Sequence, residues 1–316
     1  MTIQTSNRVW LTGDAVVDLI PNDQFTYLKC PGGAPANVAV AIARLQGETG
    51  FFGRVGNDPL GRFMQKTLAD ESVETSRLIL DDEQRTSTVI VDLDDDGERS
   101  FTFMVKPSAD QFLVPQDVPS FKQGEWLHVC SIALANEPSR SSTLAAMEQI
   151  KQAGGFVSFD PNLRDEVWAN PEEIIPVVQK AIALADVVKF SDDELLFLTG
   201  CDSIESALAS LPQTDNQLVL ITQGAKGALV VFGGEQELQS GKAVKPVDTT
   251  GAGDAFVGGL LASLARAEQW QRADAIRQAV KWANACGALA TTQKGAMTAL
   301  PTESELEAYL RVKPRS

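Results

Sequence analysis

The stretch that decides the fold is Trp126-Leu127-His128-Val129-Cys130-Ser131-Ile132, an apolar run typical of a buried strand. From this run onward, apolar segments alternate with segments of helical periodicity. Strands are predicted at 155–159, 187–190 and 218–222, and helices at 139–153, 171–185 and 203–211. Such alternation is typical of βαβ units. We therefore expect an α/β fold with a parallel sheet covered by helices.

The two ends of the chain extend this pattern. A first strand is predicted at 9–11, and a helix at 35–45 that is closed by Gly47. Phe51-Phe52 follows as a strand, and Asp58-Pro59 supplies an N-cap and a first-turn proline for a helix through residue 68. The predicted C-terminal helices cover 253–266, 271 to about 291, and a short stretch from Thr302.

One segment does not fit the alternation of strands and helices. Residues 86–93 and 98–105 show the alternating pattern of strands, and Asp94-Asp95-Asp96-Gly97 between them is typical of a hairpin turn. An isolated hairpin is marginally stable in water, so we expect it to join extended chain near 16–30 in a small sheet apart from the core. Such a sheet could close over a ligand or meet its copy in a second subunit.

The composition restricts the partners of the chain. Of its 316 residues, 44% are hydrophobic and 22% are charged, as in ordinary globular proteins. The formal charge of −15 repels nucleic acid and anionic membrane surfaces, so neither is an expected partner. No apolar run reaches the length of about 18 residues that a membrane span requires, and residues 1–7 lack the pattern of a signal peptide. We expect a cytoplasmic protein.

Cysteine and histidine are too sparse to form a metal centre or a nucleophilic triad by themselves. The four cysteines are scattered and are expected to be reduced: Cys30, Cys130, Cys201 and Cys286. The single histidine, His128, lies in the apolar run quoted above and is interpreted as a core residue. Any chemistry would therefore use carboxylates, backbone amides, lysine or arginine.

The most informative motif is Asp248-Thr249-Thr250-Gly251-Ala252-Gly253-Asp254. Its glycines let backbone amides point outward at the start of the following helix, where the helix dipole attracts anions. Asp254 in the same turn could accept a proton from an alcohol that attacks phosphorus. This combination is what phosphoryl transfer requires. The alternative is a glycine turn in which an aspartate caps a buried helix.

A second motif is Gly32-Gly33-Ala34-Pro35-Ala36-Asn37. Its glycines permit close approach of the backbone to a ligand, and the side-chain amide of Asn37 can form hydrogen bonds with a hydroxyl group. Upstream, Asp14 and Asp18 would face one side if their segment is extended. Two carboxylates and an amide facing one space suit a neutral polyol. The alternative is two turn aspartates and a capping asparagine.

Three further segments follow predicted strands. Ser191 and Glu194 form a capping box, which is a sufficient structural explanation by itself. Thr222-Gln223-Gly224-Ala225-Lys226-Gly227 lies where parallel sheets bind ligands, but its pattern is weakly specific. In Asp160-Pro161-Asn162-Leu163-Arg164, the arginine could bind a phosphate or carboxylate, or form a surface ion pair.

Together these motifs resemble the ribokinase-like carbohydrate kinases, also called the PfkB family, over essentially the whole chain. The likeness is closer to the fructokinase branch, through Tyr27-Leu28-Lys29-Cys30-Pro31, Asp160-Pro161-Asn162-Leu163-Arg164 and Lys294-Gly295-Ala296-Met297. The resemblance implies a three-layer α/β/α fold with a mostly parallel central sheet and a small β-sheet lid. It also implies one kinase domain over 1–316, with lid segments at about 14–33 and 85–113.

The same resemblance assigns roles to individual residues. Asp254 would be the catalytic base, and the amides of Gly251, Ala252 and Gly253 would hold the transferred phosphoryl group. Substrate-side positions match Asp18, Gly33, Asn37, Phe103 and Arg164, with Asp14 nearby. Positions lining the nucleotide match Lys189, Glu194, Thr222, Gly224, Gly227, Gly251, Gly253 and Asn284. The monovalent-cation site matches Asp248 with the carbonyls of Thr250, Ala290, Gln293 and Gly295.

Two positions depart from the family pattern. Ser191 stands where the family has an asparagine tied to magnesium and phosphate, so only Glu194 is carried over there. Ala299 stands where the family has a serine near the cation.

The resemblance implies an ATP-dependent kinase that phosphorylates the O6 hydroxyl of D-fructose, with Mg²⁺ and K⁺ as cofactors. One alternative is a kinase for aminoimidazole riboside or another sugar or nucleoside of the same family. The other is a non-catalytic sugar-binding sensor. In the hairpin, Phe101 and Phe103 would face one side and cover the sugar, or simply pack the small sheet. The opposite face would join a homodimer through the lid.

Overall fold

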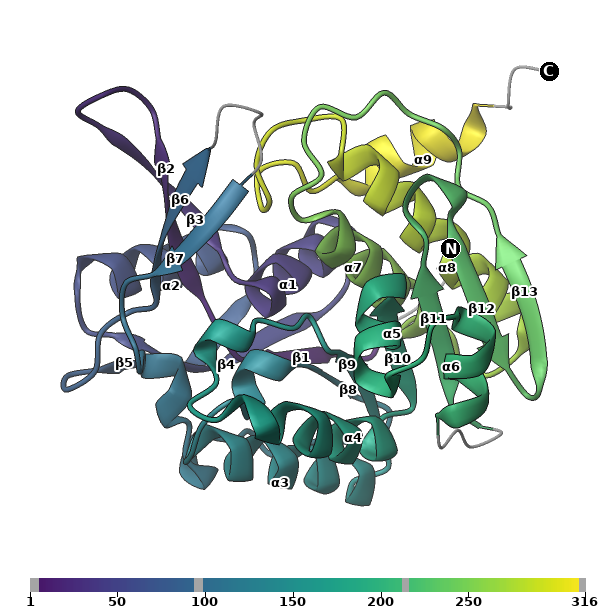
Figure 1. Ribbon diagram of the computed structural model, residues 1–316, viewed down its shortest axis with the longest axis horizontal. Helices are drawn as coiled ribbons and strands as arrows, with labels where there is room; N and C mark the ends of the chain where they lie inside the picture. Colours follow the sequence, from purple (N-terminus) through teal and green to yellow (C-terminus); the bar gives the residue numbers. More distant parts are fainter. Residues whose placement is uncertain (1–5, 94–98, 212–215, 313–316) are drawn as a thin grey trace.

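The computed structural model describes residues 6–93, 99–211 and 216–312. Within them lies a nine-stranded sheet of order β13-β12-β11-β10-β9-β8-β1-β4-β5 (Figure 1). The strands from β11 to β5 in this order are all parallel, whereas β12 and β13 are antiparallel additions at one edge. Their bounds are β1 Val9–Thr12, β4 Thr49–Gly56, β5 Glu74–Asp81, β8 Trp126–Cys130, β9 Phe156–Asp160, β10 Val187–Ser191, β11 Leu218–Thr222, β12 Ala228–Phe232 and β13 Glu235–Gln239. The predicted α/β fold with a mostly parallel sheet is confirmed.

Helices cover both faces of this sheet. One face carries α1 Ala34–Arg44, α2 Pro59–Asp70, α7 Ala252–Leu264, α8 Ala273–Ala290 and α9 Glu303–Arg311. The other carries α3 Ser139–Gln152, α4 Ile174–Leu184, α5 Asp192–Thr199 and α6 Ile204–Ser210. In the described part of the chain, no helix combines the length and apolar character that a membrane crossing needs.

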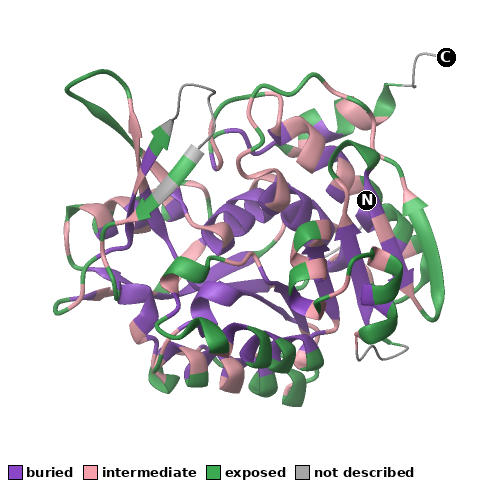
Figure 2. Ribbon diagram, in the orientation of Figure 1, coloured by how far each residue is buried: buried purple, intermediate pink, exposed green. Residues whose placement is uncertain are grey.

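The sheet divides the hydrophobic core in two. Because successive side chains of a strand point to opposite faces, Leu11 of β1 packs with α1 and α7, while its neighbour Trp10 packs with α3. Figure 2 shows the central strands buried between the helix layers. These strands are nearly continuous in apolar residues, as expected for a parallel sheet covered on both faces.

A second, four-stranded sheet of order β3-β2-β6-β7 stands at one end of the molecule (Figure 1). Its strands are β2 Val16–Pro21, β3 Tyr27–Gly32, β6 Thr88–Leu93 and β7 Arg99–Phe103. The strands β6 and β7 pair antiparallel, with Val89 opposite Phe103, and β2 joins β6 in parallel. The predicted hairpin and its union with the 16–30 segment are therefore confirmed. The predicted turn at 94–97 lies outside the described residues.

Some elements were not predicted. The edge strand β5 and the outer strand β13 gave no clear sequence signal, because β5 is half-polar and every residue of β13 is at least partly exposed. The strand β12, Ala228–Phe232, was also not predicted, although its residues form an apolar run. The closure of α1 by Gly47 was also wrong in detail. The helix ends at Arg44, and Gln46 adopts the left-handed conformation, with φ of 60°, while the amide of Gly47 donates to Ile42.

One edge of the large sheet collects the ends of the strands that matter most. Since β1, β8, β9, β10 and β11 run parallel, their carboxyl ends meet at the same edge. In open α/β sheets, ligands bind in the crevice outside this edge. The fold thus brings together the loops that follow these strands.

Gly33 fixes the approach of α1 to this edge. It is the N-cap of α1, with φ of 97°, and a Cβ there would overlap the carbonyl oxygen of Asp14. We predict that Gly33→Ala lowers the free energy of unfolding in urea by at least about 2 kcal/mol. Gly241→Ala, whose Cβ would meet open space, is the control and should change it by less than about 0.5 kcal/mol. Equal small effects would contradict this role of Gly33.

Candidate active site

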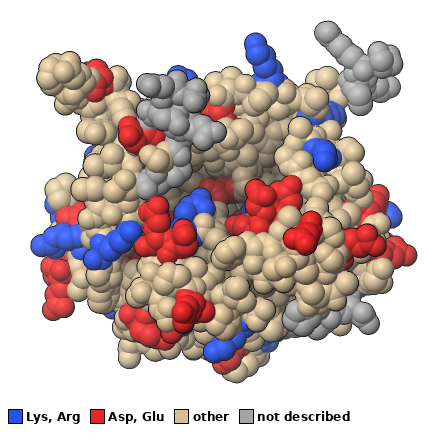
Figure 3. Space-filling model, in the orientation of Figure 1, with Lys and Arg blue, Asp and Glu red and all other residues tan. Residues whose placement is uncertain are grey.

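A cavity of about 220 Å³ lies between the small sheet and the amino ends of α1 and α7. Figure 3 shows this face of the molecule hollowed, with charged side chains around the hollow. The cavity collects most of the substrate-side residues predicted from the sequence, together with the glycine loop before α7. Its lining includes Asp14, Asp18, Gly33, Asn37, Phe103, Arg164, Thr250, Gly251, Gly253 and Asp254.

Asp254 lies in the first turn of α7, which begins after Gly251, a residue with φ of 76°. Its side chain is buried, and its Oδ2 accepts a hydrogen bond of 2.8 Å from Nδ2 of Asn37 in α1. Burial raises the pKa of Asp254, while the Asn37 hydrogen bond and the charges of Lys189 and Arg164 act against that rise. The result is a buried carboxylate that is held in place and can take up a proton.

Two acceptor atoms of the cavity lack a protein partner. They are Oδ1 of Asp14 and Oδ1 of Asn37, both buried and without a hydrogen bond among the described residues. A buried acceptor without a donor is costly, so the site is arranged for a ligand that brings donors. Burial, reinforced by the charge of Asp110, raises the pKa of Asp14 to about 7. Hydroxyl groups are the donors that fit such neutral or anionic acceptors.

Gly32 and Phe101 do not line this cavity. A Cβ on Gly32 would collide with the carboxylate of Asp18, so Gly32 makes room for that side chain. Phe101 pairs with Val91 in the small sheet, and its side chain lies outside the described residues.

The amino end of α7 has the features of an anion site. The would-be Cβ position of Gly253 is 3.6 Å from Nζ of Lys189, so an ammonium group lies beside the free end of the helix. The helix dipole and this cation act on the same space. Of the three predicted amides, that of Ala252 already donates to the carbonyl of Thr249, at 3.2 Å. Its part in anion binding is therefore weaker than the sequence suggested.

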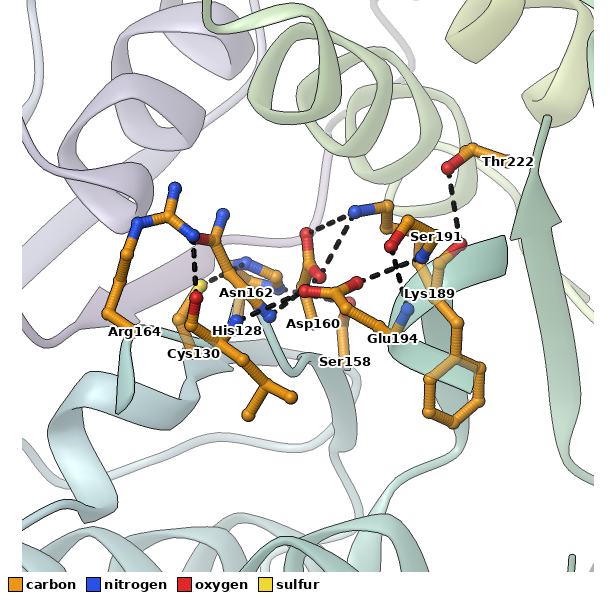
Figure 4. A network of polar contacts seen from close by, with 12 residues as sticks. His128, Cys130, Ser158, Asp160, Asn162, Arg164, Lys189, Ser191, Glu194 and Thr222 are labelled. Atoms are coloured by element: carbon orange, nitrogen blue, oxygen red, sulfur yellow. Dashed lines mark hydrogen bonds and ion pairs between the residues drawn. The ribbon is translucent and has the colours of Figure 1, made fainter. Parts of the chain in front are cut away.

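Lys189 belongs to a polar network that connects the end of β9 and its following loop with β10 and the start of α5 (Figure 4). Its Nζ donates to both carboxylate oxygens of Asp160, at 3.1 and 3.0 Å. Burial disfavours the ammonium form, but the attraction of Asp160 and Glu194 outweighs it and raises the pKa of Lys189. The lysine therefore stays charged beneath the anion site.

Glu194 completes the network at the start of α5. Its Oε2 accepts from the amide of Ser191, at 2.9 Å, as the predicted capping box requires. Its Oε1 accepts from the amide of Leu163, at 3.1 Å, and so holds the loop that carries Arg164. The substrate-side loop after β9 is thereby fixed to β10 and α5.

His128 lies under this network with no exposed surface. Its Nδ1 is 3.1 Å from Oγ of Ser158 and its Nε2 is 3.5 Å from Sγ of Cys130 (Figure 4). Burial and the charge of Lys189 lower its pKa to about 3, so the ring is neutral. The interpretation of His128 as a core residue is confirmed, and none of the four cysteines, all of them in the described part of the chain, forms a disulfide.

Gly251 and Gly253 line the cavity, whereas the other residues predicted for the nucleotide lie outside it, along the ends of β10 and β11, on α5 and on α8. The Thr222 hydroxyl donates to the carbonyl of Phe190, at 3.1 Å, and the Asn284 amide donates to Gln239, at 2.9 Å. Gly224 and Gly227 have φ of 55° and 100°, which favour glycine. Thr222 and Asn284 are half-buried and Gly224 is exposed, whereas Gly227 is buried.

Asp248 joins the two loops predicted for a monovalent cation. Its Oδ1 accepts from the amide and hydroxyl of Thr250, at 3.0 and 2.7 Å, and its Oδ2 accepts from the amide of Gly295, at 2.9 Å. The loop after α8, which follows Ala290 and contains Gln293, therefore lies against the loop before α7. A carboxylate among backbone carbonyls is a hard oxygen donor set, which fits a large alkali ion. Among the described residues, no group of three or more His, Cys, Asp or Glu could hold a metal.

Some lining residues were not predicted as site residues. Asn162, with φ of 39°, and Ala296 lie within the motifs at 160–164 and 294–297, so these motifs could have indicated them as site residues. Val16, Val89 and Ile132 carried only the signal of buried strands. Asp110, which acts on Asp14, follows the hairpin and had no recognisable pattern.

Comparison with known proteins identifies relatives over the full fold. Residues 6–303 match the family described as "pfkB family carbohydrate kinase". The chain is 65% identical to a fructokinase of Vibrio alginolyticus, covering 96% of this chain and 99% of that protein. It is 46% identical to an aminoimidazole riboside kinase of Salmonella typhimurium, covering 98% and 96%. A crystal structure of a Vibrio cholerae fructokinase double mutant with fructose, ADP and potassium ion matches with a TM-score of 0.94 and 66% identity, covering 97% and 99%.

The raised pKa of Asp14 gives a prediction about stability. With a pKa of about 7 in the folded protein against 3.8 ordinarily, the folded chain holds a proton that the unfolded chain releases, so burying Asp14 costs more as pH rises from about 4 to 7. Asp14→Asn removes this cost. Its gain in unfolding free energy over the wild type, measured in urea, should be greater at pH 8 than at pH 4.5 by roughly 2–4 kcal/mol.

Asp202→Asn, at an exposed position, serves as the control and should show no such trend. A pH-independent effect of Asp14→Asn would contradict the assignment.

Proposed function

Because the chain belongs to the pfkB family of carbohydrate kinases, we propose that it is an ATP-dependent fructokinase. It transfers the γ-phosphoryl group of ATP to the O6 hydroxyl of D-fructose and releases fructose 6-phosphate and ADP. The observation that carries this proposal is the placement of buried Asp254, held by Asn37, at the amino end of α7 and in one cavity with Asp14. The fructokinases among its relatives support fructose as the acceptor.

Asp254 is the proposed catalytic base. As O6 bonds to the γ-phosphorus and the bond to the bridging oxygen of ADP breaks, the hydroxyl proton passes to the Asp254 carboxylate. The amides of Gly251 and Gly253 and the ammonium of Lys189 stabilise the charge on the transferred group. Because Asp160 holds Lys189 on both carboxylate oxygens, this cation is already oriented before ATP binds.

The cavity presents hydrogen-bond acceptors to the sugar. Asp14, Asp18 and Asn37 accept hydrogen bonds from its hydroxyl groups, and Arg164 donates from the loop after β9. Aminoimidazole riboside is the rival acceptor within the family. A non-catalytic sensor would not require the carboxylate at the anion site, so this alternative fits the geometry least.

The nucleotide lies, in this proposal, along the surface formed by Thr222, Gly224, Gly227 and Asn284, with Lys189 beneath its phosphates. Magnesium would neutralise charge on these phosphates, and Glu194 would be the carboxylate that holds it there. Potassium would be held by Asp248 and the carbonyls of Thr250, Ala290, Gln293 and Gly295. Its binding would order the loop that forms the anion site.

We further propose that the small sheet is a lid that joins two copies of the chain. Phe103 is half-buried and reaches the cavity from the end of β7. Apolar side chains elsewhere on or beside this sheet are exposed, among them Phe25 at 87%, Leu28 at 57% and Met104 at 55%. Such side chains suit a homodimer interface. The cytoplasmic location stays a prediction from the sequence.

The acceptor is tested with a coupled ADP-release assay on fructose, ribose, adenosine and aminoimidazole riboside. We expect the highest kcat/KM with fructose. A higher kcat/KM with aminoimidazole riboside would contradict fructose as the physiological acceptor while leaving the kinase activity in place.

The base is tested with Asp254→Asn. This change keeps the shape and a hydrogen-bonding group but removes the proton acceptor, so kcat should fall by a factor of about 10²–10⁴ while fructose affinity barely changes. Asp70→Asn, at an exposed position on α2, is the matched control and should keep wild-type turnover. Near-normal kcat in Asp254→Asn would remove Asp254 from the mechanism.

The cation site is tested by replacing a bulky organic cation with potassium at fixed Mg-ATP. Activity should rise, because the ion would order the loop between Asp248 and α7. In Asp248→Ala the response to potassium should be lost. A flat response of the wild type from zero to saturating potassium would contradict the proposed site.

A further inference from the structure

Arg44 is the last residue of α1, the helix whose first turn carries Asn37. Asn37, Ala41 and Arg44 are spaced four and three residues apart, so they lie along one face of the helix. The first of them binds Asp254, and the second packs against Gly258 of α7. Arg44 therefore continues the contact face of α1 toward its carboxyl end.

The guanidinium group of Arg44 is held on one side and donates on the other. Its Nε and Nη2 donate to the two carboxylate oxygens of Glu71, the C-cap of α2, at 2.9 and 2.7 Å. Its Nη1 donates to the carbonyl of Leu300, at 2.7 Å, and to that of Thr298, at 3.4 Å. A bidentate carboxylate fixes the plane of a guanidinium group. Glu71 therefore directs Nη1 toward the loop that follows α8.

The loop after α8, residues 291–300, carries carbonyls that are proposed to bind potassium, among them that of Gly295. The amide of Gly295 donates to Oδ2 of Asp248, at 2.9 Å. Ala296 packs against Gly251 of the anion site, because a Cβ on that glycine would lie only 2.9 Å from the Cα of Ala296. The loop is thus held at its middle by a carboxylate and at its end by the guanidinium group.

These two attachments bear on the free energy of cation binding. An alkali ion gathers several carbonyl oxygens around it, and a loop that is already fixed loses less conformational entropy on binding than a loop with many conformations. Gln293, Lys294 and Thr298 are exposed, so side-chain packing constrains this part of the loop little. The hydrogen bonds to the loop therefore supply a large part of its constraint.

We propose that Arg44 is a positioning residue for the monovalent-cation site and that Glu71 acts through it. The pair fixes the carbonyls of the loop before the ion binds, and so raises the affinity for potassium. The inference rests on the proposed function, because it takes the loops joined by Asp248 as the cation site.

The proposal is tested by thermal unfolding in KCl, with tetramethylammonium chloride keeping the ionic strength constant. An ion that binds the folded protein raises Tm, and the concentration dependence of that rise gives an apparent Kd. Arg44→Met keeps an apolar stem but removes every donor to the loop, so the apparent Kd for potassium should rise at least about fivefold. Glu71→Gln removes the charged bidentate partner and should raise this Kd as well, which keeps the proposal testable if Arg44→Met fails to fold.

Lys66→Met is the matched control, because it removes the cation of an exposed ion pair on α2, with Asp70. It should leave the apparent Kd within about twofold of the wild-type value. In the ADP-release assay with fructose, Arg44→Met should need at least about fivefold more potassium for half-maximal activity, while kcat at saturating potassium stays within about twofold. A purely structural role would lower Tm without changing either dependence on potassium.

An unchanged apparent Kd in Arg44→Met, or in Glu71→Gln if only that variant folds, would overturn the proposal. A kcat of Arg44→Met that stays low at saturating potassium would also overturn it, because the ion would then fail to restore the loop. If potassium neither stabilises nor activates the wild type, the result would instead contradict the cation site of the proposed function.

Discussion

The hydrogen bond between Asn37 and Asp254 joins the amino ends of α1 and α7, and the rest of the site is arranged around it. Its length of 2.8 Å depends on the close packing of these two helices. Gly258 of α7 lies against Ala41 of α1, and a Cβ on that glycine would overlap the alanine side chain. The helices can therefore approach closely enough for Asn37 to reach Asp254. Without this donor, the buried carboxylate would lose one of the interactions that favour its charged form, a cost of about 1–3 kcal/mol.

The ion pair between Lys189 and Asp160 connects this helix end to the sheet. Both residues are buried, and Lys189 reaches the amino end of α7 from β10. Asp160 also accepts from the amide of Asn162, while Glu194 holds the next residue, Leu163. A shift in the loop that carries Arg164 would therefore disturb the cation beneath the anion site. These contacts physically connect the residues proposed to bind the sugar with those proposed to bind the nucleotide.

Much of this arrangement could be predicted from the sequence, and the exceptions have physical reasons. Strong periodicity predicted the parallel strands and their covering helices, and glycine motifs indicated the helix ends that line the cavity. The edge strands β5 and β13 were not predicted, because polar residues on exposed edges weaken the alternation of apolar and polar residues that indicates a strand. The hydrogen bond from the Ala252 amide to Thr249 depends on how the local turn before α7 closes. The proximity of Asp14 to Asp110 depends on tertiary contacts. No local pattern reports such contacts between segments that are distant in the sequence.

The central claim is that Asp254 takes the proton of the acceptor hydroxyl in a cavity that Asp14 and Asn37 also line. The most direct test is a crystal structure of the protein with fructose and a non-hydrolysable ATP analogue. The account predicts that O6 of the sugar lies within hydrogen-bond distance of the Asp254 carboxylate, with the γ-phosphate at the amino end of α7 and other hydroxyl groups of the sugar at Asp14 and Asn37. A sugar bound with O6 at Asp14 and no hydroxyl near Asp254 would contradict it.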